Sequence, residues 1–175
     1  AIDPKNPAND IITDIDKAAT SSDGMVEFSA DFYLIKPKNI ESGNGAIFFE
    51  VGNRGRPGAL TRFNRAADSL HPISDQEMGD GFLLREGFSL LWVGWQHDTP
   101  LVEGRLRTYP PIATNNGIPI EGLVRSDVIV TDKTYSHSLG NRDHIAYPAA
   151  NPEDSRNRMT VRDGISGIRR TIPRA

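Results

Sequence analysis

The sequence predicts an α/β protein built on a mixed sheet, and three observations support that prediction. An apolar run at 46–51 is followed by a glycine-rich turn, a helix signal and a second apolar run at 88–95. Two short buried strands joined through a helix form the unit of a parallel sheet. Before them, residues 25–35 alternate apolar and polar side chains, which is typical of a half-buried strand. We therefore expect the sheet to begin antiparallel and to continue as a parallel strand–helix–strand unit.

The connection between the two apolar runs carries the helix signal. Ser74 and Glu77 have the spacing of a capping box, in which each side chain accepts the other residue's backbone N–H. Met78 and Phe82 continue a partial apolar stripe, and Gly87 stands where a left-handed residue would end the helix. The pattern predicts one helix that begins after Ser74 and ends before Gly87.

The first 45 residues are expected to form edge strands and to wrap a surface. The apolar cluster of Ile11, Ile12 and Ile15 favours a short edge strand, and Asn44-Gly45 favours a tight hairpin into the run at 46–51. The apolar face predicted for the strand at 25–35 consists of Val26, Phe28, Ala30 and Phe32.

Beyond Gln96 the chain has frequent prolines and little periodicity, so it predicts a loop-rich β excursion. Within it, strands are expected at 123–131 and 158–162. We therefore expect residues 1–175 to form one domain or part of one. It would consist of an edge-strand and wrap segment (1–45), a strand–turn–helix–strand core (46–96) and the loop-rich β excursion (97–175).

Composition narrows the class of protein. A net charge of −3, with 20 basic and 23 acidic side chains and no clustered basic patch, gives no case for nucleic-acid binding. No window approaches the roughly 20 apolar residues of a membrane span. We expect a soluble chain, with secreted and periplasmic locations open. Because it starts at Ala1, we expect it to be processed or excised. Without cysteine it has neither disulfides nor thiolate metal sites.

The glycine-rich turn from Gly52 to Gly58 is the first candidate site. Its spacing, G-x-x-G-x-x-G, fits neither nucleotide-binding fingerprint, so a phosphate loop is disfavoured. Backbone N–H groups directly after a buried strand could instead face the charge that develops on an acyl oxygen. Asn53, Arg54 and Gly55 are therefore oxyanion-loop or pocket candidates, with a purely structural turn as the alternative.

Trp95, Gln96 and His97 are secondary pocket candidates, because they follow the second apolar strand and open α/β sheets place ligands at the carboxyl ends of their strands. His97-Asp98 could also be a solvated strand end. As metal ligands these two residues lack partners at a recognised spacing, so we expect neither a metal nor a cofactor. No G-x-S-x-G elbow occurs, and no catalytic residue is assignable.

Short motifs over nearly the whole chain occur in the same order as in a known group of proteins. The chain resembles the N-terminal portion of a group of large bacterial and fungal proteins described as alpha/beta-hydrolase-domain proteins. The motifs are Ile2-Asp3-Pro4, Asn9, Ile11, the run 24–32, Gly43-Asn44-Gly45, Asn53-Arg54-Gly55, Phe63-Asn64, the run 79–83, Gly87-Phe88, the run 92–96, Val161-Arg162-Asp163 and the run 169–174.

The resemblance implies an esterase-like enzyme with a serine nucleophile on a strand-to-helix elbow. In the family the elbow, the acid and the histidine follow later in the chain. This chain would then supply the early sheet and the oxyanion-type loop, with Asn53, Arg54 and Gly55 matching the family's pattern. Implied partners are the remainder of the hydrolase chain, or a second chain completing the sheet, and a small ester-like substrate.

The sequence is also compatible with two other functions. The turn-rich second half and the paired Trp92 and Trp95 are compatible with a non-catalytic, β-rich binding or interaction module. A metal-dependent hydrolase would use His97 and Asp98.

Overall fold

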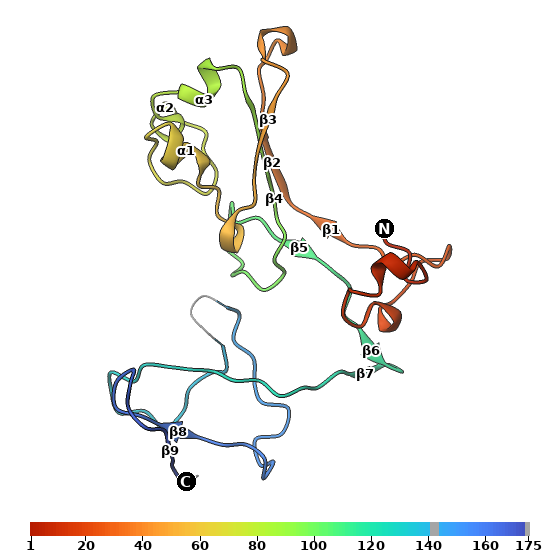
Figure 1. Cartoon of the computed structure of the whole chain (residues 1–175), viewed down its shortest axis with the longest axis vertical. Helices are drawn as coiled ribbons and strands as arrows, with labels where there is room; N and C mark the ends of the chain where they lie inside the picture. Colours follow the sequence, from red (N-terminus) through yellow and green to blue (C-terminus); the bar gives the residue numbers. More distant parts are fainter. Residues whose placement is uncertain (141–143, 174–175) are drawn as a thin grey trace. The chain divides into compact units, whose positions relative to one another are not determined.

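The computed structural model describes residues 1–140 and 144–173 and has a mixed α/β architecture of small sheets and few helices (Figure 1). The described chain divides into two compact units. The first comprises Ala1–Gly122 together with His144 and Ile145, and the second contains the remaining described residues. Among the described residues, no helix has the length and apolar character needed to cross a membrane.

A three-stranded sheet organises the first unit. Its order is β2 (Phe32–Ile35), β4 (Ser89–Val93), β3 (Ile47–Glu50). β4 pairs antiparallel with β2 and parallel with β3 (Figure 1). The predicted antiparallel start and the parallel pair of apolar strands are both confirmed.

The predicted hairpin between the first two of these strands is wrong, because β4 lies between β2 and β3. The connection instead contains the 3-10 turn η3 (Ile40–Ser42). Asn44 binds the turn that precedes β4: its N–H donates to the Gly87 carbonyl at 2.9 Å and its side-chain amide to the Glu86 carbonyl at 2.7 Å. The Asn-Gly pair thereby sets β3 beside β4 and not beside β2.

Three short helices, α1 (Ala59–Phe63), α2 (Asp75–Met78) and α3 (Phe82–Arg85), cross from β3 to β4. The prediction of one continuous helix from Ser74 is wrong. Gly79 and Gly81 have φ of 66° and 70°, which an α-helix cannot accommodate. A Cβ on Gly79 would lie 2.1 Å from the Asn64 carbonyl oxygen, so the break is required by close packing.

Both predicted ends of that helical segment are confirmed. The Ser74–Glu77 capping box forms, with the Ser74 N–H donating to the Glu77 carboxylate at 2.9 Å. Gly87 has a φ of 78° directly after the last helical turn.

The core lies between the sheet and these helices. Leu90 and Trp92 of β4 are fully buried and pack with the buried residues Ala59, Leu60 and Leu83. Their burial follows from the period of a strand, since residues 90 and 92 share one face. The opposite face of the sheet is open, and Phe32 and Phe49 remain more than half exposed on it.

The apolar face predicted for residues 25–35 is confirmed at Val26, which is buried, but is wrong for Phe28 and Phe32. In β2 the partly buried side chains are Tyr33 and Ile35, while Phe28 and Phe32 are exposed. The cause is a change of partner at Asp31: β1 (Ser29–Ala30) pairs with β5 (Thr108–Tyr109), whereas β2 pairs with β4.

The first 25 residues contain the 3-10 turns η1 (Pro7–Asn9) and η2 (Ile15–Lys17) and not the predicted edge strand. Ile15 is buried but Ile11 is exposed, so the isoleucines do not share one strand face. An antiparallel bridge between Ile2 and Val26 connects the start of the segment to the chain that follows it.

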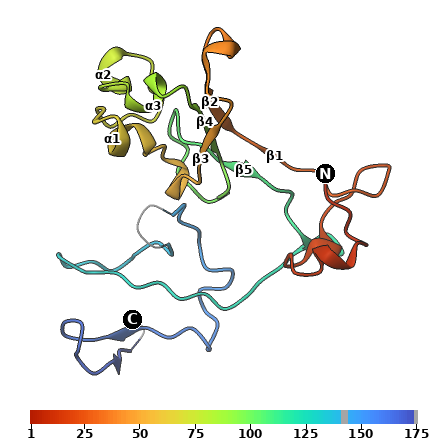
Figure 2. The ribbon, with the colours of Figure 1, turned by 45° about the horizontal axis from the view of Figure 1, so that its top comes forward.

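Later strands are two residues long. β5, which pairs with β1 (Figure 2), is one of them. β6 (Thr114–Asn115) and β7 (Ile118–Pro119) form a hairpin in the first unit, and β8 (Thr160–Val161) and β9 (Arg170–Thr171) form a ladder in the second (Figure 1). The strand expected at 158–162 is confirmed over β8. The strand expected at 123–131 is wrong, because that segment pairs with no strand in the part of the chain that the structure describes.

Candidate functional site

The loop after β3 and the segment after β4 meet at one edge of the sheet. The 3-10 turn η4 (Asn53–Gly55) follows β3, and Trp95, Gln96 and His97 follow β4. Because β3 and β4 are parallel neighbours, their carboxyl ends share an edge, where open α/β sheets bind ligands. The structure therefore brings two of the predicted candidate sets together.

Specific hydrogen bonds join the two segments. The Arg54 N–H donates to the Gln96 side-chain oxygen at 2.7 Å, and the Trp95 indole N–H donates to the Gly52 carbonyl at 2.8 Å. A third bond reaches the loop from elsewhere in the unit, since the Leu106 N–H donates to the Gly55 carbonyl at 3.0 Å. The predicted pocket residues Trp95 and Gln96 thus hold the predicted loop in place.

Arg54 adopts a left-handed backbone conformation, with φ 54° and ψ 35°. For a residue with a Cβ this conformation costs about 1–2 kcal/mol. Such strain persists where surrounding contacts over-determine it, and it concentrates at functional sites. The Gln96 bond to the Arg54 N–H is one of those contacts.

Two of the three N–H groups of the loop Asn53–Gly55 are engaged within the protein. Gln96 takes the Arg54 N–H, and the Gly52 carbonyl takes the Gly55 N–H at 3.4 Å. An oxyanion would therefore have to displace Gln96 before it could bind the Arg54 N–H. The oxyanion role of Asn53, Arg54 and Gly55 stays a prediction.

Asp98 lies next to this loop and binds the Arg54 side chain. Its carboxylate accepts the Arg54 guanidinium at 2.6 Å through one oxygen and meets the His144 Nδ1 at 2.7 Å through the other. Its backbone carbonyl accepts a second Arg54 N–H at 2.8 Å. The sequence placed Asp98 only beside His97 as a metal ligand. Its position just past a strand end was the available signal, whereas His144 lies in a stretch of loop composition that carries none.

The electrostatics favour an ionised Asp98. Partial burial raises its pKa, but the Arg54 hydrogen bond and the charges of Arg54 and His144 outweigh that effect and hold the pKa of Asp98 below its usual range.

His97 takes part in the structure through its backbone and not through its imidazole. Its backbone carbonyl accepts a hydrogen bond from the Arg107 guanidinium, and its imidazole makes no hydrogen bond or ion pair with the described residues. Among residues 1–140 and 144–173, no group of three His, Cys, Asp or Glu side chains could hold a metal ion.

Glu50, the last residue of β3, ties the sheet to the helix that follows the loop. Its carboxylate accepts the N–H groups of Gly58 and Ala59 at 2.9 and 2.7 Å and the Trp92 indole N–H at 2.5 Å, and it pairs with Arg62 at 2.5 Å. Burial raises the pKa of Glu50, but these hydrogen bonds and the Arg62 charge together lower it. Glu50 thereby fixes where the loop leaves the strand and where α1 begins.

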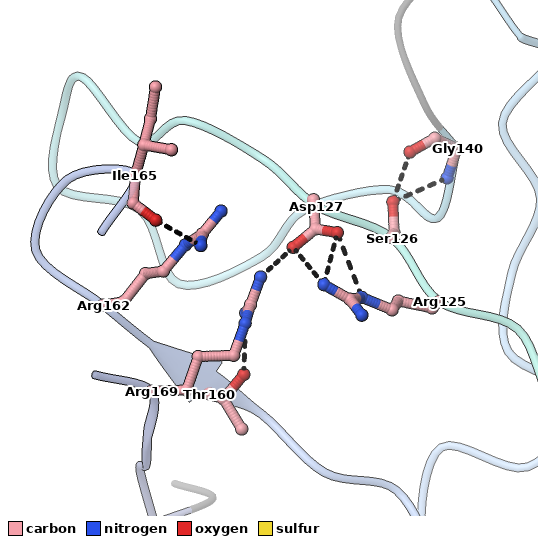
Figure 3. Close-up of polar contacts among 8 residues, drawn as sticks. All are labelled: Arg125, Ser126, Asp127, Gly140, Thr160, Arg162, Ile165 and Arg169. Atoms are coloured by element: carbon pink, nitrogen blue, oxygen red, sulfur yellow. Dashed lines mark hydrogen bonds and ion pairs between the residues drawn. The ribbon is translucent and has the colours of Figure 1, made fainter. Parts of the chain in front are cut away.

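The second unit has a polar cluster of its own around Asp127 (Figure 3). The carboxylate of Asp127 pairs with Arg125 at 3.0 Å and with Arg169 at 2.5 Å, and Arg169 also donates to the Thr160 hydroxyl at 3.1 Å. These contacts connect the segment at 123–131 to the β8–β9 ladder. The side chains of Arg125, Asp127 and Arg169 are all at least one-third exposed, so these ion pairs connect two segments at the surface of the unit.

Comparisons of this chain with protein-family models, with curated proteins and with solved structures find no match.

Proposed function

We propose that this chain is the N-terminal part of an alpha/beta-hydrolase that hydrolyses small ester-like substrates, with a serine nucleophile located beyond this sequence. The chain contributes the early sheet and an oxyanion-type loop. The observation that carries the proposal is the position of η4, a strained turn that directly follows β3 at the carboxyl edge of two parallel strands.

The chemistry of acyl transfer explains why such a position is useful. A tetrahedral intermediate places negative charge on the former carbonyl oxygen, and pre-positioned N–H groups stabilise it. In alpha/beta-hydrolases one such N–H comes from the loop that follows an early strand, and the other comes from the residue after the nucleophile. The loop Asn53–Gly55 occupies the first of these positions in the proposal.

The open sheet is the second support. β3 lies at the edge of the described three-stranded sheet, and its Ile47 and Phe49 side chains are 61% and 54% exposed. On β2, Phe32 is 67% exposed on the same uncovered face. Parallel strands are normally covered on both faces, and natural edges are normally blunted. In the proposal, the remainder of the hydrolase chain, or a second chain, completes this sheet.

Pre-steady-state hydrolysis of 4-nitrophenyl acetate tests the proposed function. The complete protein, including residues after Ala175, should release a burst of nitrophenolate because an acyl-enzyme accumulates. The 175-residue chain alone should show no burst. No hydrolysis by the folded complete protein would contradict the proposal, and a burst from the 175-residue chain would place the nucleophile inside it.

A further inference from the structure

Arg107 is a partly buried arginine that has no carboxylate partner among the described residues. Its guanidinium donates through Nη2 to the His97 carbonyl and lies over the Tyr109 ring, with Cζ 5.8 Å from the ring centroid. Its Nε and Nη1 are buried, and neither has a hydrogen-bond partner in the part of the chain that the structure describes. Buried charged groups are normally paired, so this guanidinium is short of an anion.

A comparison with Arg54 shows that the shortage is specific to Arg107. The guanidinium of Arg54 pairs with the Asp98 carboxylate at 2.6 Å and also donates to the Asp98 carbonyl at 2.8 Å. Asp31, which contacts the Arg107 backbone, accepts its N–H at 3.0 Å and the Tyr109 hydroxyl at 2.9 Å, but it forms no ion pair with the guanidinium. The anion that satisfies Arg107 therefore has to come from outside the described residues.

The segment that carries Arg107 packs against the candidate loop. The Leu106 N–H donates to the Gly55 carbonyl at 3.0 Å, and a Cβ on Gly55 would lie 2.8 Å from the Arg105 Cγ. The His97 carbonyl that binds the Arg107 guanidinium follows the end of β4. Arg107 is thus held at the same edge of the sheet as the proposed oxyanion-type loop.

The chemistry of the unused donors favours a carboxylate. Guanidinium N–H groups match the oxygens of a carboxylate and form charge-assisted hydrogen bonds with them. Thr99, in the same segment, is fully buried, and its hydroxyl has no hydrogen-bond partner among the described residues, so it is a further unused donor. One guanidinium balances the single charge of a carboxylate, whereas a phosphate would bring a charge of about −1.5 to −2 to an edge that already contains Asp98.

We propose that Arg107 binds a carboxylate of the substrate, and that the enzyme hydrolyses half-esters of dicarboxylic acids. This inference rests on the proposed function and names its substrate class. The carboxylate belongs to the acyl group of the ester, because the loop Asn53–Gly55 would receive the acyl oxygen and Leu106, next to Arg107, is hydrogen-bonded to that loop. Arg107 is then a specificity-determining residue.

Steady-state kinetics of the complete protein on paired esters test the inference. The mono-4-nitrophenyl esters of succinic, glutaric and adipic acid are compared with 4-nitrophenyl butyrate, pentanoate and hexanoate, after subtraction of the uncatalysed rates. Each pair differs only by a carboxylate in place of a terminal methyl group. At least one charged ester should have a kcat/KM about 10-fold or more above that of its neutral partner, because a hydrogen bond to a charged group contributes that factor.

Three variants assign the preference to its side chain. Arg107→Gln should lower kcat/KM for the preferred charged ester by about 10- to 100-fold, mainly through KM, and should change the neutral ester by less than about twofold. Arg107→Lys should keep part of the preference, because it keeps the charge. Arg85→Gln is the matched control, since Arg85 is exposed, donates to the Asp80 carbonyl and precedes the amino end of β4; it should leave the preference unchanged.

Each outcome decides one point. A parent that hydrolyses the neutral esters but prefers none of the charged ones overturns the inference and leaves the proposed function standing, as when an acidic residue of the remaining hydrolase chain pairs with Arg107. An Arg107→Gln variant that loses the same factor on charged and neutral esters has lost a structural side chain, which also overturns it. A folded parent that hydrolyses none of the esters removes the proposed function and the inference together.

Discussion

Different kinds of interaction stabilise the two units of this chain, each considered by itself. In the first, β4 is sandwiched between two strands and buries Leu90 and Trp92 completely against short helices. In the second, no described residue is buried, and Leu123, Ile129 and Ile168 are more than 90% exposed. Its order rests on one two-residue ladder, one isolated bridge and exposed polar contacts around Asp127.

The difference shows where the free energy of folding resides. Burying an aliphatic side chain contributes about 1.5–3 kcal/mol, whereas an exposed ion pair contributes about 0–1 kcal/mol. The first unit can therefore be stable through its own core. The second unit exposes apolar side chains, which under the proposed function the remainder of the hydrolase would cover.

The strongest test of this comparison uses matched leucines. Leu90→Ala, at a fully buried site, should lower the free energy of unfolding by about 2–5 kcal/mol because it leaves a cavity. Leu123→Ala, at a site that is 94% exposed, should change it by less than about 0.5 kcal/mol. Urea unfolding followed by Trp fluorescence measures both. Equal effects would mean that the second unit has a core of its own.

Matched glycines sharpen the comparison further. Gly79 and Gly164 have nearly equal φ, 66° and 67°, but a Cβ would meet the Asn64 backbone at Gly79 and open space at Gly164. Gly164→Ala should cost only the left-handed penalty of about 1–2 kcal/mol. Gly79→Ala should add an overpacking cost of about 1–3 kcal/mol. Thermal unfolding of the first unit for Gly79 and hydrogen exchange at β8 for Gly164 provide the readouts, and a smaller effect at Gly79 would contradict the close packing.

Glu50 provides the pH-dependent test. Glu50→Gln should destabilise the first unit by about 1–3 kcal/mol at neutral pH, because charge-assisted hydrogen bonds are lost. Since folding lowers the pKa of Glu50, its contribution is present above the unfolded pKa of about 4.3 and disappears as the pH falls through the lower folded value. The parent and the variant should therefore converge in stability in acid. A difference that stays constant with pH would show that the carboxylate's charge is irrelevant.

The smallest effect is expected at Asp127. Asp127→Asn weakens the ties to Arg125 and Arg169, so amide exchange at β8 and β9 should become faster, with more effect at low salt than at high salt. Asp132→Asn is the control, since among the described residues the side chain of Asp132 has a hydrogen bond only from the neighbouring Thr131 hydroxyl. Unchanged exchange in Asp127→Asn would mean that the ladder alone orders this unit.

The sequence predicted correctly those features that adjacent residues encode, and it failed where a distant contact decides the structure. The apolar runs at 46–51 and 88–95, the Ser74 cap and the left-handed Gly87 are encoded in adjacent residues, and all of them are confirmed. The hairpin at Asn44-Gly45 was wrong because a distant partner, the Gly87 turn, binds Asn44. The broken helix was missed because the contact of Gly79 with Asn64 is tertiary.

The candidate site divides in the same way. The positions of Arg54 and Gln96 after two parallel strands could be predicted, because the carboxyl ends of such strands meet. The bond between Gln96 and the Arg54 N–H could not, since it depends on a side-chain orientation. His144 had no local pattern at all, and only the fold of the chain brings it to Asp98.

The most direct test of the account is covalent labelling of the complete protein with a fluorophosphonate, which reacts with activated serines, followed by peptide mapping. We expect an adduct on one serine outside Ala1–Ala175. Absence of an adduct in protein that is folded and whose Leu90 core is intact would contradict the assignment of this chain to a serine hydrolase.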